Sequence, residues 1–399
     1  MAATYDIAII GGGAAGALAA LGARSIDRSL SILILEKEER RFRKIGASGN
    51  GRCNLLNECD IEGRYHGSDP TFVRGALYRM TAADLRRYFA SIGLLTLLDR
   101  EGRVYPRSMQ SRSVIRVLER ALGDAGIMWH GPAAVIDVTA SDGFTLTLDD
   151  GSVVLARSVV IACGGPAAPN LGGSSSGLTL LRSLGHAIVP PRPALVPLTL
   201  ADHPLTAMAA GVRFRGRAAV DDTVSEGEFL ITDYGLSGIA AMELGRAVAM
   251  HPGTDATVEI HFLPECTEDE ILMYLMAGRD DLPTALAGLV PENIGRALLA
   301  SEPKDMSLER LAHRLTSLSV PVRGTRGFEF AQVTAGGAAT DGFDPTTMMS
   351  DIVPGLFAAG EVLDIDGDTG GFNLMWAFAS GWLAGESAAR RLRNKREAQ

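Results

Sequence analysis

The sequence has few cysteines, and none of them are paired at the spacing of a metal or redox motif. The four are Cys53, Cys59, Cys163 and Cys266, and no CxxC occurs. This argues against a zinc site and against a disulfide reductase. No two histidines stand at metal-ligand spacing either, so we predict no metal. We expect reduced thiols in a cytoplasmic protein.

Long apolar runs and a secretion signal are also missing. The longest apolar stretch, 372–384, contains Asn373, Ser380 and Gly381. It is shorter than the roughly 20 residues that a membrane helix needs. The N-terminal residues show no basic segment followed by an apolar stretch and a cleavage site. We therefore expect neither a membrane protein nor a secreted one, and interpret 372–384 as a buried helix.

Positive charge is not concentrated anywhere in the chain. Lysine and arginine form no dense stripe, and the net charge of the 399 residues is -9, which argues against nucleic-acid and anionic-membrane partners. Hydrophobic residues make up 46% and charged residues 21%, as in globular proteins. The length allows two or three domains. We expect an enzyme acting on a small molecule; the oligomeric state stays open.

What the chain does have is a glycine-rich turn directly after its first apolar strand. Residues 5–10 run into the GxGxxG pattern of Gly11, Gly13 and Gly16, with Ala14 and Ala15 between. The three glycines suit a tight turn, a close approach of backbone to phosphate, and close packing of helix on strand. A pyrophosphate would then meet the N-terminus of the following helix.

A carboxylate stands where such a nucleotide site needs one. The second strand, 31–35, ends at Glu36, followed by Lys37, twenty residues after Gly16. Glu36 could accept hydrogen bonds from ribose hydroxyls and would repel a 2′-phosphate. An ordinary glycine turn is the alternative, but strand, helix and acidic residue together favour a dinucleotide site.

A second glycine-rich segment, 44–54, has the pattern of neither a periodic helix nor a strand. Its backbone amides and polar side chains could line a ligand, with its basic residues facing negative charge. A surface loop is the alternative. The candidate cofactor residues here are Lys44, Ser48, Gly49, Asn50, Gly51, Arg52, Cys53 and Asn54.

Between these glycine segments and the C-terminal region, the pattern changes near Arg192, where several prolines precede short alternating runs. We predict a β-rich insertion over 192–263, a helical subdomain over 264–321, and a Rossmann-like domain over 1–191 and 322–399. The expected helices are 81–92, 113–122, 293–299 and 307–318, and Thr267 with Glu270 forms a capping box. The expected strands are 133–138 and 144–148 as a hairpin, 159–162, 228–232 and 257–262.

Near its end the chain returns to a ligand-facing turn. The strand 356–359 ends at Gly360 and Glu361, and an acidic loop, 364–371, precedes a helix that begins near Asn373. A flavin enzyme must hold the distal half of a long cofactor, so this return favours FAD over a nicotinamide alone. The helix start would stabilise the negative charge of a reduced flavin.

The acidic loop could instead bind calcium, because Asp364, Asp366 and Asp368 alternate as at positions 1, 3 and 5 of a calcium loop. Position 12 is Met375, where a bidentate glutamate is required. We therefore predict no calcium.

Taken together, these segments resemble the bacterial flavoprotein family labelled BaiN-like or aminoacetone-oxidase-like NAD(P)/FAD-dependent oxidoreductases, over nearly the whole length. The matching pieces are IIGGGAAG at 9–16, GNGRCN at 49–54, GRVYP at 102–106, LGHAIVPPRPALVPL at 184–198, TDYGLSG at 232–238, QVTAGG at 332–337 and GLFAAGEVLDIDGDTGGFNLMWAFASG at 355–381. The resemblance implies an α/β fold, in which a glutathione-reductase-like or fumarate-reductase-like FAD domain is interrupted by a β-barrel-like domain with a helical subdomain.

The resemblance also implies where non-covalent FAD binds. It puts 11–16 at the pyrophosphate, Glu36 at the ribose, the Val135 backbone beside adenine, and 49–54 along the flavin. Gly360 and Glu361 come near the ribitol. The pyrimidine edge falls to Gly371, Phe372, Asn373 and Leu374, and the turn after the third strand adds Ala162, Cys163, Gly164 and Gly165. Cys163 replaces the family's usual threonine, and 173–177 lacks its usual acidic residue, which puts these local contacts in question.

For catalysis we single out Tyr234, as an acid or a substrate-orienting group, and Arg52 or Arg107, as partners of an anionic substrate group. A buried tyrosine and surface ion pairs are the alternatives. Only one GxGxxG occurs, so NAD(P)H would visit the substrate cleft transiently. We expect reduction of a conjugated double bond, or oxidation of an amine or alcohol. A flavin-binding redox sensor or partner-binding module, and a flavin-dependent RNA-modifying enzyme, are the alternatives.

Overall fold

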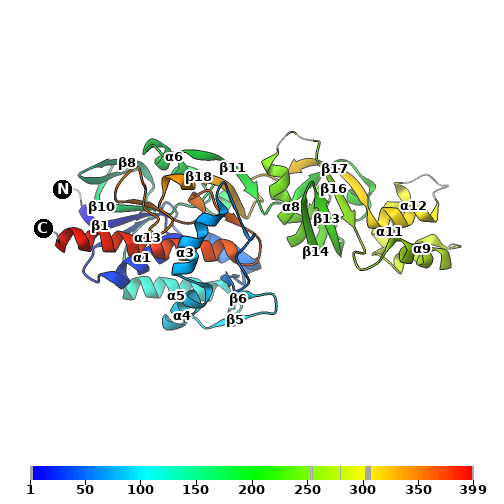
Figure 1. Cartoon of the computed structure of the whole chain (residues 1–399), viewed down its shortest axis with the longest axis horizontal. Helices are drawn as coiled ribbons and strands as arrows, with labels where there is room; N and C mark the ends of the chain where they lie inside the picture. Colours follow the sequence, from blue (N-terminus) through cyan, green and yellow to red (C-terminus); the bar gives the residue numbers. More distant parts are fainter. Residues whose placement is uncertain (1–2, 252, 254, 279, 302–306, 398–399) are drawn as a thin grey trace. The chain divides into compact units, whose positions relative to one another are not determined.

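The computed structural model describes residues 3–251, 253, 255–278, 280–301 and 307–397. The chain divides into unit 1, Met1–Pro191 with Val333–Gln399, and unit 2, Arg192–Gln332 (Figure 1). We predicted that 322–332 belongs with the first domain, and this is wrong. Strand β17 (Leu318–Thr325) pairs with β12 (Leu198–Leu200) and β16 (Thr257–His261), so its hydrogen bonds place it in unit 2.

Unit 1 is built on a seven-stranded sheet with the order β7-β2-β1-β10-β9-β8, in which β19 also pairs with β10. Unit 1 as a whole, with its smaller sheets included, contains the strands β1 (Ala3–Ile10), β2 (Ile32–Leu35), β3 (Leu56–Asn57), β4 (Tyr65–His66), β5 (Thr96–Leu98), β6 (Arg103–Pro106), β7 (Met128–His130), β8 (Val135–Ser141), β9 (Gly143–Leu148), β10 (Val153–Ile161), β11 (Ile188–Ala194, which crosses into unit 2), β18 (Val333–Ala338), β19 (Leu356–Ala358) and β20 (Asp366–Gly367). Its helices are α1 (Ala14–Ile26), α2 (Arg43–Ala47), α3 (Val73–Arg79), α4 (Ala82–Ser91), α5 (Ser111–Asp124), α6 (Ser176–Ser183) and α13 (Phe372–Glu397), with short 3₁₀ turns η1 (Ser48–Gly51), η2 (Pro70–Phe72), η3 (Pro169–Leu171), η4 (Thr340–Gly342) and η5 (Gly360–Val362).

The register of the parallel strands aligns their carboxyl ends. Ile10 pairs with Leu35 and with Ile161, and Ile161 pairs with Ala358. The strands are buried on both faces, which explains their continuous apolar runs. The turns after β1, β2, β10 and β19 therefore meet at one edge of the sheet, where α/β proteins bind their ligands.

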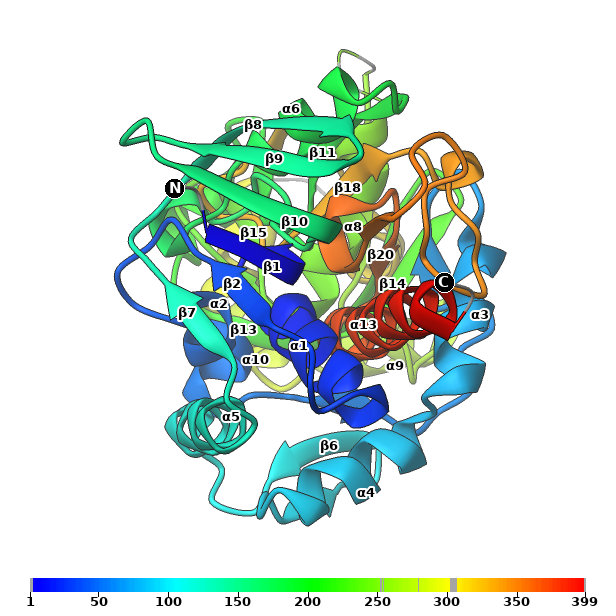
Figure 2. The ribbon, with the colours of Figure 1, turned by 90° about the vertical axis from the view of Figure 1, so that its left-hand side faces the viewer.

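Helices α1 and α13 pack against each other below this sheet (Figure 2). A Cβ atom added at Gly381 would lie 2.2 Å from the Ala15 carbonyl oxygen, and one added at Gly385 would lie 1.8 Å from that of Ala19. Only glycine permits this approach, because any side chain would overlap the facing backbone. The crossing holds the first helix of the chain against the last one.

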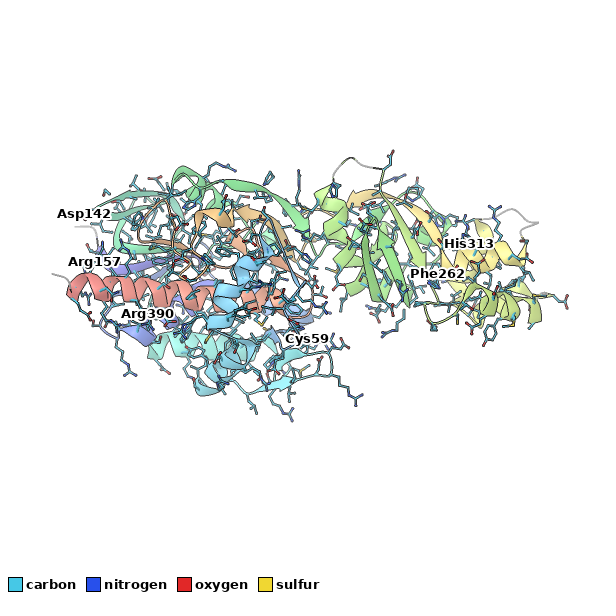
Figure 3. The ribbon with its side chains drawn as sticks, viewed as in Figure 1. Cys59, Asp142, Arg157, Phe262, His313 and Arg390 are labelled. Atoms are coloured by element: carbon cyan, nitrogen blue, oxygen red, sulfur yellow. The ribbon has the colours of Figure 1, made fainter. Side chains whose placement is uncertain are left out.

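Unit 2 is a closed barrel with the strand order β12-β15-β14-β13-β16-β17 and its own apolar core. Its other strands are β13 (Arg213–Val220), β14 (Thr223–Ile231) and β15 (Gly235–Ser237), and its helices are α7 (Pro204–Met208), α8 (Ile239–Met250), α9 (Glu268–Ala277), α10 (Leu282–Ala287), α11 (Glu292–Ala300) and α12 (Leu308–Thr316). Phe262 lies in the core, and His313 on α12 pairs with Glu268 on α9 at 3.1 Å (Figure 3).

Local sequence signals locate some of the elements, whereas β10 and β14 begin six and five residues before their predicted starts at 159 and 228. Thr81 and Thr267 both form the capping boxes that begin α4 and α9. The predicted helix 307–318 is too long, because Leu318 already starts β17. The segment 44–54, predicted to be neither a periodic helix nor a strand, contains the end of α2 and the short turn η1, in which Gly49 and Asn50 have left-handed backbone angles.

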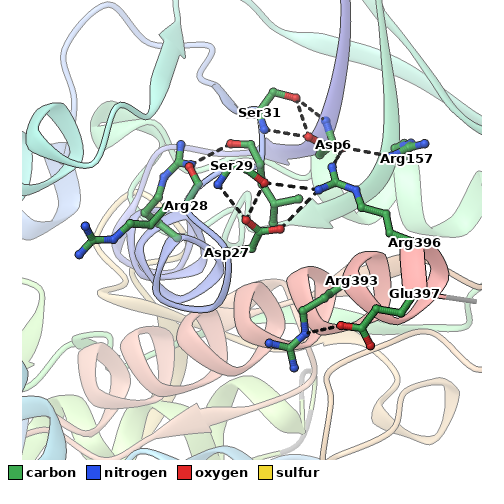
Figure 4. Close-up of polar contacts among 11 residues, drawn as sticks. Asp6, Asp27, Arg28, Ser29, Ser31, Arg157, Arg393, Arg396 and Glu397 are labelled. Carbon is green, nitrogen blue, oxygen red and sulfur yellow. Dashed lines mark hydrogen bonds and ion pairs between the residues drawn. The ribbon is translucent and has the colours of Figure 1, made fainter.

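Asp6 on β1 ties the end of α13 to the sheet (Figure 4). Its Oδ2 accepts hydrogen bonds from the Ser31 amide at 2.9 Å and hydroxyl at 3.0 Å, while its Oδ1 faces Arg396 at 3.0 Å and Arg157 at 3.3 Å. Burial opposes ionisation, but the hydrogen bonds from Ser31 and the charge of Arg396 outweigh it and lower the Asp6 pKa below 3.8.

We expect Asp6→Asn to destabilise the protein by about 1–2 kcal/mol at neutral pH. Because the folded pKa is lowered, this contribution is present above the ordinary pKa of 3.8 and lost as the pH falls through the folded value. Urea unfolding of both proteins between pH 7 and pH 3 measures the difference. A gap between them that does not shrink toward the acid end would contradict the ionic account.

Candidate active site

The first glycine loop has two packed positions and one open position. A Cβ atom at Gly11 would lie 2.4 Å from the Ala162 carbonyl oxygen, and one at Gly16 would lie 1.9 Å from that of Gly11. At Gly13 an added Cβ would meet no atom within 4 Å. Gly11 and Gly16 thus pack against the protein, whereas Gly13 faces space in which a ligand fits without clash.

Two helices, α1 and α13, begin near this edge, and α1 begins without a side-chain cap. Gly13 caps α1 with no side-chain hydrogen bond, and neither α1 nor α13 has an acidic residue in its first turn. Gly381, which packs on the first turn of α1, lies nine residues after Phe372, the first residue of α13. That separation is about 14 Å along the helix axis. The site therefore offers unpaired amides and a helix dipole at two separated points.

Glu36 lies beside the first of these points. Its carboxylate accepts hydrogen bonds from the Gly12 amide at 2.7 Å and the Glu38 amide at 2.9 Å. Its carbonyl oxygen accepts from the Ala133 amide at 2.8 Å, which holds the segment leading to Val135 next to it. Lys37 turns its amine toward Glu38, at 4.0 Å. Glu36 and Val135 are therefore close, as one nucleoside would require.

An ion pair connects two of the glycine turns. The Lys44 amine lies 3.1 Å from Glu361 Oε2, while Glu361 Oε1 accepts the Thr334 amide at 3.0 Å. Gly164 and Gly165 border this pair, and a Cβ atom at Gly165 would lie 2.4 Å from the Thr334 hydroxyl. Thr334 received no role from the sequence, although it lies in the QVTAGG segment that the resemblance matched.

The segment 48–54 adopts left-handed backbone angles at Gly49, Asn50 and Gly51, with φ of 56°, 53° and 79°. The Ser48 hydroxyl donates to the Ile45 carbonyl at 2.8 Å and so serves the loop itself. Cys53 is 0% exposed. The Cys53 side chain is therefore buried in the apolar core, so a cofactor contact at this position would come from its backbone.

Asn54 places a buried side-chain acceptor beside the start of α13. Its Oδ1 is buried and has no hydrogen-bond partner among the described residues. A Cβ atom at Gly371 would lie 2.7 Å from this oxygen, so Asn54 borders the start of α13. A buried unpaired acceptor costs free energy unless a ligand or water satisfies it.

The acidic loop before α13 is fixed by side chains from β3 and β4. Asp368 pairs with His66 at 2.7 Å and Arg64 at 3.2 Å, and the Tyr65 hydroxyl donates to the Phe372 carbonyl at 3.0 Å. The Asn373 side chain bonds the backbone of Gly367 at 2.9 and 2.7 Å, so its amide secures the loop and is not free for a ligand. In the described ranges, no group of three or more His, Cys, Asp or Glu side chains is arranged to hold a metal.

The three predicted catalytic residues are divided between the two units. Arg52 is exposed on unit 1, 5.8 Å above the Tyr105 ring, and Arg107 is exposed just after β6. Tyr234 belongs to unit 2, where its ring lies 4.2 Å from the guanidinium carbon of Arg326. Sequence reasoning missed Arg326, because 92 residues separate it from Tyr234.

No helix in the described part of the chain has the length and apolar character of a membrane span.

The family model described as HI0933-like protein Rossmann domain matches residues 5–387. The chain is 38% identical to the 3-dehydro-bile acid delta(4,6)-reductase of Clostridium scindens, over 96% of this chain and 99% of that one. It is 30% identical to the ribosomal RNA dihydrouridine synthase of Escherichia coli, over 96% and 97% of the two chains.

A solved structure of 3-ketosteroid delta1-dehydrogenase from Sterolibacterium denitrificans shares the fold, with a TM-score of 0.52, 12% identity, and coverage of 97% of this chain and 100% of that one. The comparisons confirm the predicted Rossmann-type fold and the predicted class, an FAD-dependent oxidoreductase. By the match over most of its length, the chain belongs to the HI0933-like Rossmann-domain family, consistent with the BaiN-like resemblance of its motifs.

Proposed function

We propose that the protein binds FAD non-covalently and reduces a carbon–carbon double bond conjugated to a carbonyl in a small organic substrate, with NAD(P)H as the transient electron donor. The observation that carries the proposal is that the glycine turns after β1, β10 and β19 lie at one sheet edge, where α1 begins at Gly13 without a side-chain cap. The relatives add the direction of the reaction, because one is named a reductase and the other forms dihydrouridine.

The residues present fit FAD. The open space at Gly13 and the amides at the start of α1 suit a pyrophosphate, and Glu36 and the Val135 backbone suit the adenosine. The start of α13 at Gly371 and Phe372 suits the electron-rich end of a reduced flavin, and the unpaired Asn54 Oδ1 offers an acceptor there. When bound, FAD supplies hydride transfer, while the protein supplies position and charge.

The cysteines support non-covalent binding. Burial raises the pKa of Cys163 to about 12 and that of Cys53 to about 11. At neutral pH both side chains are therefore thiols, and the thiol is the unreactive form. The cysteines of the described residues are all free, which accords with a cytoplasmic location.

Substrate contacts remain proposals. We propose that Arg52 or Arg107 pairs with an anionic group, because both are exposed and Arg107 has no ion pair among the described residues. We propose that Tyr234 orients the substrate or donates the proton that must reach the carbon next to the carbonyl. No second GxGxxG is available to hold a resident nicotinamide.

An RNA-modifying enzyme is the second candidate, since the dihydrouridine synthase of Escherichia coli matches over 96% of this chain. Uracil also contains a double bond conjugated to a carbonyl, so the same chemistry would serve. The net charge of -9 and the higher identity to the bile-acid reductase favour a small substrate. RNA that copurifies with the protein, or binding that weakens steeply with salt, would favour the second candidate.

We expect anaerobic NADH or NADPH to bleach the bound flavin, and a 3-oxo-Δ4 steroid to restore its absorbance in stopped-flow measurements. An unconjugated steroid alcohol is the matched control and should leave the reduced flavin unchanged. Bleaching of the oxidised flavin by amines or alcohols would reverse the proposed direction. A flavin that no nicotinamide reduces and no metabolite reoxidises would favour the redox sensor or partner-binding module.

A further inference from the structure

Unit 2 contains an arginine held by two aromatic rings. The guanidinium carbon of Arg326 lies 4.2 Å from the ring centroid of Tyr234 and 4.0 Å from that of Phe330. Its backbone amide donates to the Pro197 carbonyl at 3.0 Å, which fixes the chain directly after β17. Both rings are at cation–π distance, so the guanidinium is held in place before any ligand arrives.

Arg326 faces aromatic rings where neighbouring arginines face carboxylates. Other barrel arginines pair with carboxylates: Arg323 with Asp202 at 3.1 Å, and Arg217 with Glu226 at 2.9 Å. Arg326 has no ion pair with any carboxylate in the described ranges, although the side chain is only partly exposed. Burial removes part of the hydration of a half-buried cation. An anion that binds beside it would compensate for that loss.

The geometry also selects the kind of partner. A guanidinium stacks on aromatic rings through its flat faces, which leaves the N–H groups along its edges free to donate. Such an edge matches the two oxygens of a carboxylate or phosphate in a bidentate pair. Phe330 is 45% exposed, so one ring of this cluster is open to solvent. An apolar surface beside an anion-binding edge suits a ligand with an apolar body and one oxyanion.

We propose that Arg326, supported by Tyr234 and Phe330, is an anion-binding site of unit 2 that recognises a carboxylate or phosphate of a ligand of the reaction. The proposal rests on the proposed function for the choice of ligands. The oxyanion comes either from a carboxylate on the substrate or from the 2′-phosphate of NADPH. In this arrangement the Tyr234 ring holds the Arg326 guanidinium in place by a cation–π contact.

Calorimetric titration of the oxidised holoenzyme tests this without any turnover. The probes are a 3-oxo-Δ4 bile acid with its methyl ester, and NADP⁺ with NAD⁺, which differ in the 2′-phosphate and cannot reduce an oxidised flavin. The wild type should prefer the charged member of one pair by about tenfold or more, as expected for a charge-assisted bidentate pair. Arg326→Gln should reduce that preference to about twofold or less. Arg323→Gln on the same barrel edge is the matched control and should keep it.

The pair that shows the effect identifies the source of the oxyanion. Equal binding within both pairs by the wild type, or an unchanged preference in Arg326→Gln, would overturn the proposal. Flavin reduction and reoxidation, measured separately, report on the proposed function. A protein that reduces the ester and the acid equally well, with no effect of Arg326→Gln, therefore refutes the anion site and leaves the reductase proposal standing.

Discussion

Gly13→Val is expected to abolish flavin binding while the protein stays folded. Gly13 has a φ of -82°, which valine can adopt, and an added Cβ meets no protein atom within 4 Å. The branched side chain would instead fill the space that we assign to the pyrophosphate. We expect a loss of flavin affinity of about 100-fold or more, which corresponds to about 2.8 kcal/mol of steric conflict.

Two measurements check this prediction. Titration of the apoprotein with FAD gives the affinity, and urea unfolding of the apoprotein gives the stability, which should change by about 0.5 kcal/mol or less. Gly16→Ala is the informative contrast, because its Cβ would lie 1.9 Å from the Gly11 carbonyl oxygen and must displace the loop itself. Wild-type flavin content in Gly13→Val would show that the cofactor does not cross this loop.

Gly385→Ala should destabilise the protein by about 3 kcal/mol through one methyl group. Its Cβ would lie 1.8 Å from the Ala19 carbonyl oxygen, so α1 and α13 must move apart. Flavin affinity should fall as well, because this crossing sets the positions of both helix N-termini.

Gly123→Ala is a control that we expect to stabilise the protein. Gly123 lies within α5, and an added Cβ atom would meet nothing within 4 Å. Alanine is the better helix former there, so we expect a gain of about 0.5 kcal/mol. Chemical unfolding of both variants measures the two effects. If Gly385→Ala and the wild type have the same free energy of unfolding, α1 and α13 can move apart without loss of stability, and the prediction is wrong.

The elements that the sequence predicted correctly are those whose signal is local. The strand, turn and helix around Gly11 and the capping boxes at Thr81 and Thr267 depend on neighbouring residues. The strand over 318–325 was not predicted, and no local feature shows that this segment closes a barrel. For this reason, residues 322–332 were predicted to belong to the first domain, whereas they belong to unit 2.

Contacts between distant residues could not be predicted. The Lys44 amine and Glu361 carboxylate are 317 residues apart, and both were chosen as cofactor residues without any indication that they pair. Which groups the Asn373 side-chain amide binds depends on the exact path of the acidic loop, 364–371, because its partners are backbone groups of that loop. Side-chain partners of this kind follow from tertiary structure, which motif spacing does not encode.

Calorimetric titration of the apoprotein with FAD, FMN and ADP decides whether the first and the last helices of the chain hold one FAD between them. If they do, one FAD binds per chain, about 100-fold or more tightly than either half molecule, because each half contacts only one helix end. FMN or ADP binding as tightly as FAD, or no FAD binding at all, would contradict this arrangement.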